Sequence, residues 1–167
     1  MPAKGKSIEV DEDLDFQQRE WTLERIGWIA MAVIVLLSLI GLFGDGPISQ
    51  STIGEEGGFE FTYARFARNN SPSEIQVSIP ESLIQEGQAS FWIDQNYLEG
   101  IQIENIFPEP EDTLLYSDRI TYTFATGNSA FPFEVKFDIT TESIGINNGK
   151  AGTVNGQQVQ FTQVVYP

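Results

Sequence analysis

The sequence predicts an all-β domain, an antiparallel β-sandwich of the Ig-like or jelly-roll-like kind, preceded by one N-terminal transmembrane helix. An uncharged apolar run comes first, a glycine-rich stretch follows, and from Phe59 onward apolar and polar residues alternate. A membrane-spanning helix needs about 20 apolar residues, whereas period-two alternation indicates strands with one buried face. We therefore expect four parts: a disordered acidic tail (1–20), the transmembrane helix (21–43), a linker (44–58) and the sandwich (59–167).

The apolar run, Ile26–Phe43, contains no charged residue and no proline. Its length corresponds to about 27 Å of helix, which matches the hydrocarbon core of a bilayer. It is apolar all round, unlike the buried helix of a soluble protein. Seven acidic residues precede it and no Ala-x-Ala pattern follows it, which argues against a cleaved signal peptide. We interpret the run as an uncleaved anchor that contacts the lipid bilayer.

The orientation of the anchor follows from the basic residues near its ends. Arg19 and Arg25 lie close to the N-terminal end, whereas the first basic residue after the anchor is Arg65. The distribution predicts a cytoplasmic N-terminus and an extracytoplasmic C-terminal domain.

Two polar segments flank the anchor. Residues 1–20 contain an acidic cluster and few apolar residues, which indicates a disordered tail. The helix is expected to begin near Gln17. Residues 44–58 contain five glycines, which indicates a flexible linker.

Beyond the linker, seven sets of alternating apolar residues are separated by turn signals. The sets begin at Phe59, Ile75, Ala89, Ile101, Ile120, Phe133 and Val159. The turn signals include Asn147-Asn148-Gly149 and the hairpin-type pair Asn155-Gly156. Residues 81–86 are consistent with a single helical turn. So many short strands with aromatic rows favour two packed sheets over one.

Composition excludes several functions. The net charge is −15, and residues 45–167 carry five basic against seventeen acidic residues, a net of −12. Such a surface repels phosphate backbones, so we expect no nucleic-acid partner. The chain has no His and no Cys, which excludes Ser-His-Asp and Cys-His catalysis as well as thiolate metal sites. We therefore predict a protein that is not an enzyme and needs no cofactor.

One acidic segment is a weak candidate for a metal site. Glu109, Glu111 and Asp112 lie close together in the sequence, with Asp118 nearby. Carboxylates on a loop suit Ca²⁺, and two of them suit acid–base chemistry if one is desolvated. Pro108 and Pro110 favour an extended, exposed segment, in which these groups are ordinary solvated carboxylates.

Four residues are candidates for partner binding: Trp92, Tyr97, Arg65 and Arg68. Because successive side chains of a strand point to opposite faces of the sheet, Trp92 faces away from Phe91 and Ile93. With Tyr97 it forms either an exposed aromatic patch or a cover for the second side of its strand. The two arginines pair either with an acidic partner or with the domain's own carboxylates.

The anchor carries a resemblance. Its block Trp21-Thr-Leu-Glu-Arg-Ile-Gly-Trp28, then Gly41-Leu-Phe-Gly-Asp-Gly-Pro47-Ile-Ser49, and the ending Val164-Val165-Tyr166-Pro167 resemble uncharacterised bacterial single-pass inner-membrane proteins. Those proteins share an R-x-G-W…G-L-F-G-x-G-P-x-S anchor. The resemblance implies a bacterial inner-membrane location and an extracytoplasmic β domain. It implies no activity and no functional residues.

The function predicted from these features is that of a membrane-anchored, non-catalytic binding or assembly subunit. Its expected partners are the lipid bilayer, through residues 26–43, and another membrane protein or complex. Two alternatives stay open: a carboxylate-dependent glycan hydrolase, which needs neither His nor Cys, and a Ca²⁺-dependent surface binding module.

Overall fold

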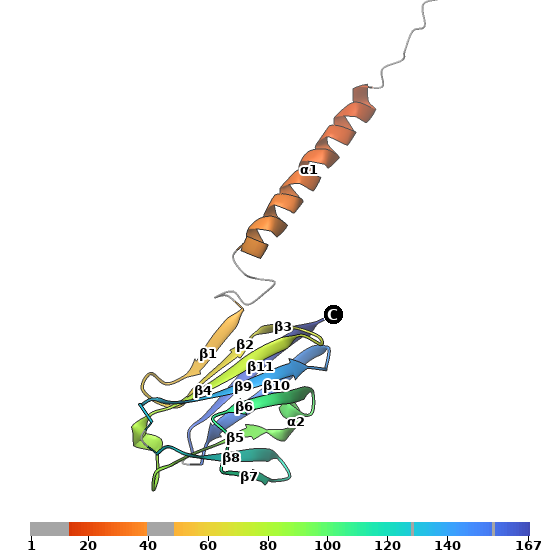
Figure 1. Ribbon diagram of the computed structural model, residues 1–167. Coiled ribbons are helices and arrows are strands. Elements are labelled where there is room, and N and C mark those ends of the chain that lie inside the picture. The colour runs from red at the N-terminus through yellow and green to blue at the C-terminus, as the bar shows by residue number, and fades with distance from the viewer. Residues whose placement is uncertain (1–13, 40–48, 128, 155) are drawn as a thin grey trace, which may run out of the picture. The chain divides into compact units, whose positions relative to one another are not determined.

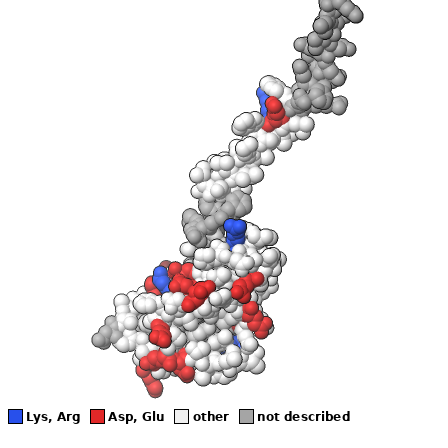
Figure 2. Space-filling view, turned by 45° about the vertical axis from the view of Figure 1, so that its right-hand side comes forward, with Lys and Arg blue, Asp and Glu red and all other residues white. Residues whose placement is uncertain are grey.

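The computed structural model describes residues 14–39, 49–127, 129–154 and 156–167. It divides into two units, a helix and a β-domain (Figure 1). The predicted disordered tail over 1–13, the end of the predicted anchor over 40–43 and the linker over 44–48 lie outside the described residues. Several groups of acidic side chains are spread over the visible face of the β-domain, and basic side chains are fewer there (Figure 2).

The helix α1 spans Leu14–Leu39. Its part from Trp21 to Leu39 is long and apolar enough to cross a membrane, and almost all of its side chains are exposed. The predicted tail is wrong for residues 14–20, which are helical. Gln, Glu, Arg and Leu have high helix propensity, so the helix that the apolar run forms extends backward through them.

The β-domain is a two-sheet sandwich, as predicted. One sheet has five strands in the order β1-β2-β4-β9-β6, and the other has six in the order β3-β11-β10-β5-β8-β7. The strand pairs are antiparallel except for β11 with β3, which is parallel. The elements are β1 (Gln50–Gly54), β2 (Glu60–Ala64), β3 (Phe66–Arg68), β4 (Pro72–Ile79), η1 (Glu81–Leu83), β5 (Gln88–Asp94), α2 (Gln95–Leu98), β6 (Ile101–Phe107), β7 (Asp112–Leu115), β8 (Arg119–Ala125), β9 (Phe133–Thr141), β10 (Gly145–Thr153) and β11 (Gln158–Tyr166).

The inner faces of the two sheets form an aromatic core. Phe91 on β5 is fully buried and lies 5.6 Å from Phe124 and 5.9 Å from Phe137, measured between ring centroids. Phe124 belongs to the same sheet and Phe137 to the facing one. The predicted alternation is confirmed in these strands, since every second side chain of β5 and β9 is buried.

The predicted linker is wrong over residues 50–54. They form β1, which pairs with β2 along its whole length. Ser49, just before it, is buried, and its hydroxyl donates to the Phe66 carbonyl at 3.1 Å. Ile53 packs against the core. The strand contains only one large apolar residue, so its alternation is too weak to recognise. The described part of the β-domain begins at Ser49.

The first prediction tests this boundary. A fragment of residues 59–167 lacks β1, which removes the burial of Ile53 and the hydrogen bonds of one strand pair. We expect its free energy of unfolding to be about 2–4 kcal/mol lower than that of residues 49–167. Urea unfolding followed by circular dichroism measures both fragments. Equal midpoints would mean that residues 49–58 act as a linker after all.

Three further sequence predictions concern β10, η1 and the connection between β10 and β11. The predicted turn at Asn147-Asn148-Gly149 lies inside β10, which runs straight through it. The predicted helical turn over 81–86 is present as the short 3-10 helix η1. The predicted turn at Asn155-Gly156 lies between β10 and β11, which pair antiparallel on either side of it; Asn155 itself is outside the described residues.

Candidate interaction site on the six-stranded sheet

The outer face of the six-stranded sheet carries the candidate site. Trp92 on β5 lies opposite Gly152 on β10 and Thr121 on β8. Its neighbours Phe91 and Ile93 are fully buried. Because side chains alternate along a strand, Trp92 must point to the outer face. The predicted parity of Trp92 is therefore confirmed, and its side chain is half-buried.

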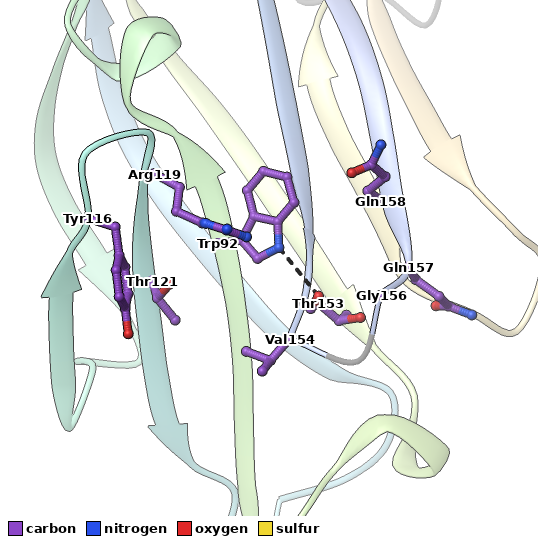
Figure 3. A pocket seen from close by; sticks show the side chains of 9 residues that line it. All are labelled: Trp92, Tyr116, Arg119, Thr121, Thr153, Val154, Gly156, Gln157 and Gln158. Atoms are coloured by element: carbon purple, nitrogen blue, oxygen red, sulfur yellow. Dashed lines mark hydrogen bonds between the residues drawn. The ribbon is translucent and has the colours of Figure 1, made fainter.

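Trp92 lines an open cleft of about 400 Å³ (Figure 3). The indole N–H donates to the Thr153 carbonyl at 3.3 Å, and the Arg119 guanidinium carbon lies 5.1 Å from the ring centroid. Arg119 also contacts Asp118 through an ion pair of 3.3 Å. The residues that line the cleft are Trp92, Tyr116, Arg119, Thr121, Thr153, Val154, Gly156, Gln157 and Gln158.

The backbone around the cleft shapes its floor. Gly152 lies opposite Trp92, and a Cβ there would collide with the carbonyl oxygen of Gln157. Only glycine therefore allows the chain to turn this closely between β10 and β11. The indole of Trp92 and the side chain of Gln158, which lie opposite Gly152 on its two sides, both line the cleft.

The chemistry of the cleft suits binding. The indole of Trp92 and the phenol of Tyr116 offer flat surfaces for stacking, and the guanidinium of Arg119 adds a positive charge. The side chains of Gln157 and Gln158 offer hydrogen-bond donors and acceptors. The guanidinium over the indole stabilises both side chains by about 0.5–1 kcal/mol at such an exposed position. Trp, Tyr and Arg are also the residues that most often dominate binding energy at protein interfaces. Among the described residues that line the cleft, none has a carboxylate.

Of the two alternatives left open for Tyr97, the exposed aromatic patch with Trp92 is wrong, and so is the assignment of Tyr97 as a partner-binding residue. Tyr97 is 2% exposed, its hydroxyl donates to the buried Gln163 at 3.3 Å, and its ring meets Phe161 edge-on at 4.7 Å. The cause is α2, which interrupts the alternation after β5 and turns this side chain into the core. Burial, with a smaller contribution from Tyr63, raises the pKa of Tyr97. Burial also raises the pKa of Tyr122 to about 12.

The two arginines predicted as partner-binding residues lie apart from the Trp92 cleft. Arg65 lines a separate cleft of about 540 Å³ together with Phe66, Asp94 and Lys150. Its guanidinium donates to the Ser51 hydroxyl at 3.0 Å. Arg68 is exposed at the end of β3. The four predicted residues therefore do not form one site, and only Trp92 belongs to the cleft described above.

The acidic segment is exposed at Glu109, Glu111 and Asp112. Glu111 accepts a hydrogen bond from the Gln88 amide at 3.2 Å, and Asp112 accepts one from the Thr113 backbone at 2.9 Å. Within the described ranges, no group of three or more His, Cys, Asp or Glu side chains is placed to hold a metal ion.

No protein-family model matches this chain. No curated protein matches it. Among solved structures, the chain is similar to the cohesin module of a family 33 glycoside hydrolase from Clostridium perfringens, with 12% sequence identity and a TM-score of 0.43. The alignment covers 69% of this chain and 98% of that module. By its own strand order, this chain is a β-sandwich with an open aromatic and cationic cleft, preceded by one apolar helix.

Proposed function

We propose that this chain is a membrane-anchored, non-catalytic binding or assembly subunit of the bacterial inner membrane, related to the single-pass proteins that its anchor resembles. The Trp92 cleft is the observation that carries the proposal. It combines Trp92, Tyr116 and Arg119 on the outer face of a sheet, where paired strands hold the backbone rigidly. A partner that covers it would desolvate an indole that is already half-buried.

The anchor and its orientation follow from α1 and its flanks. The stretch from Trp21 to Leu39 has the length and composition to cross a membrane. Arg19 and Arg25 at its N-terminal side favour a cytoplasmic N-terminus, which leaves the β-domain on the extracytoplasmic side. The strong negative charge of the domain then keeps it soluble beside anionic headgroups.

A carboxylate-dependent glycan hydrolase has weaker support. Glycoside hydrolysis ordinarily needs two carboxyl groups that flank one bond. The Trp92 cleft contains no carboxylate, and the Arg65 cleft contains only Asp94. Glu109, Glu111 and Asp112 are exposed rather than desolvated, which suits neither an acid held neutral nor a strong metal site.

The experiment that tests the proposal uses the full chain, purified from bacterial membranes in mild detergent. We expect a stoichiometric partner to co-purify, and we expect proteinase added to intact spheroplasts to digest the β-domain while sparing the N-terminal tail. A β-domain protected from proteinase would contradict the orientation. A monomeric chain that cleaves members of a glycan panel would contradict the binding function and favour the hydrolase.

A further inference from the structure

The described strands leave four sheet edges, and of these β7 is the one that carries two consecutive exposed leucines. Proteins usually guard an edge with a bulge, a charge or a very short strand. The edge strand β6 has an irregularity between Ile103 and Asn105, β3 has only three residues, and β1 is mostly polar. In contrast, β7 carries two consecutive leucines, Leu114 and Leu115, which are 46% and 69% exposed and project from opposite faces of the sheet.

The open side of β7 presents backbone groups that no neighbouring strand pairs with. Directly after β8, the Thr126 amide donates to the Gly87 carbonyl just before β5. Because hydrogen-bonded pairs alternate along an antiparallel ladder, the even-numbered residues of β8 also direct their backbone groups toward β5. The odd-numbered ones then face β7, in agreement with the bond from the Tyr116 amide to the Arg119 carbonyl. By the alternation of an antiparallel ladder, the N–H and C=O groups of Thr113 and Leu115 point toward the open edge. The Thr113 N–H donates to the Asp112 carboxylate there at 2.9 Å, so a further strand would pair with the Thr113 carbonyl and with both backbone groups of Leu115.

Apolar side chains border this edge on both faces of the sheet. Leu114 lies opposite Thr121, which is in turn opposite Trp92. These three side chains therefore form a row across the outer face of the sheet, from the cleft to the edge. Leu115 projects from the other face. An added strand would therefore gain main-chain hydrogen bonds from the edge and apolar contacts on each side, which is the arrangement of strand addition.

The charges around β7 indicate which net charge a strand added at this edge should carry. Glu109, Glu111 and Asp112 lie at its beginning and Asp118 follows its end, whereas the nearby Arg119 is already paired with Asp118. A second copy of this chain would bring another net charge of −12 in residues 45–167. Antiparallel pairing of two β7 strands would also place acidic residues of one copy beside Asp118 of the other. Charge complementarity favours a basic partner.

We infer that the open edge of β7 docks an extended segment of a partner protein, with apolar residues in alternation and Lys or Arg at its ends. The segment adds to the six-stranded sheet as a further strand next to β7. The inference rests on the proposed binding function and specifies how the partner is held. The backbone of Thr113 and Leu115 binds the added strand of the partner. The Trp92 cleft receives side chains from other parts of the same partner.

The test uses the full chain in detergent micelles and two synthetic peptides. One has the sequence Lys-Lys-Val-Thr-Val-Thr-Val-Lys-Lys, and the other has Glu in place of each Lys. We expect the basic peptide to bind and to slow amide hydrogen exchange at Leu115, whose N–H points toward the open edge. The acidic peptide should bind at least about tenfold more weakly, a difference of about 1.4 kcal/mol.

Two variants at the edge and one matched control complete the test. Leu115→Pro removes an outward N–H without removing a bond to β8, and it should abolish binding of the basic peptide. If that variant fails to fold, Leu115→Lys serves in its place, because it keeps the backbone and repels the basic peptide. Ile146→Lys is the control, since Ile146 on β10 is also 69% exposed; it should leave binding unchanged.

Each other result overturns the inference. Equal binding of both peptides, or protection at another edge, would exclude docking at β7. A dimer of the full chain that Leu115→Lys dissociates would show that the occupant is a second copy. If Trp92→Ala releases the natural partner and Leu115→Lys retains it, strand addition is wrong and the proposed function stands. If neither variant affects a bound partner, both are wrong.

Discussion

Replacing Phe91 by Ala is expected to lower the free energy of unfolding of the β-domain by about 4–5 kcal/mol. The ring is fully buried and lies against Tyr122 and Phe124 of its own sheet and Phe137 of the facing one. Its removal leaves a cavity between the sheets that these neighbouring rings cannot fill without leaving their own contacts. Domains of this size have a total stability of about 5–15 kcal/mol, so a large part of it would be lost.

Urea unfolding of residues 49–167 measures this effect. The control is Ile146→Ala on the exposed part of β10, which should change stability by less than about 0.5 kcal/mol. A loss below about 2 kcal/mol for Phe91→Ala would mean that the core collapses around the cavity. In that case Phe91 does not link the two sheets as described.

Gly149→Ala is expected to cost about 3 kcal/mol, more than an ordinary substitution in a strand, because there is no space for a methyl group. A Cβ at this position would lie 2.5 Å from Phe161 Cζ and 2.9 Å from Tyr97 Cγ. Gly149 lies directly opposite Phe161 on β11. The Phe161 ring is held in turn by Phe61, 4.6 Å away between centroids, so it has little freedom to move.

A double-mutant cycle identifies the cause of this loss. Phe161→Leu removes the ring that the new methyl group would meet, so Gly149→Ala should cost less in that background by at least about 1 kcal/mol. Lys150→Ala, at the exposed neighbouring position, is the control and should have little effect. If the two substitutions are additive, the destabilisation has another origin than the overlap with Phe161.

Much of the sandwich was predictable because period-two alternation reports burial directly. Phe91 and Ile93 are inside and Trp92 is outside, as their parity requires. The predictions fail where a contact distant in sequence overrides the local signal. Gly149 belongs to an apparent turn motif, yet it is a strand residue because the Phe161 ring packs over it.

The candidate site was less predictable because it depends on how strands pair. The sequence identifies Trp92, but Arg119 and Gln158 join it only through the register of β8 with β5 and of β11 with β10. Tyr97 was misplaced because α2 breaks the alternation over four residues, too few for a helical period to be visible. The edge β7 has no alternation at all, since each of its side chains is exposed.

Partner retention by Trp92→Ala is the measurement that tests the central claim most directly. The full-length variant is purified in mild detergent beside the unchanged chain and beside Ile144→Ala, an exposed position outside the cleft. A tryptophan at the centre of an interface contributes about 2 kcal/mol or more, so Trp92→Ala should lose most of the partner while its β-domain still unfolds cooperatively. Ile144→Ala should retain the partner. Full retention by a folded Trp92→Ala variant would contradict the account.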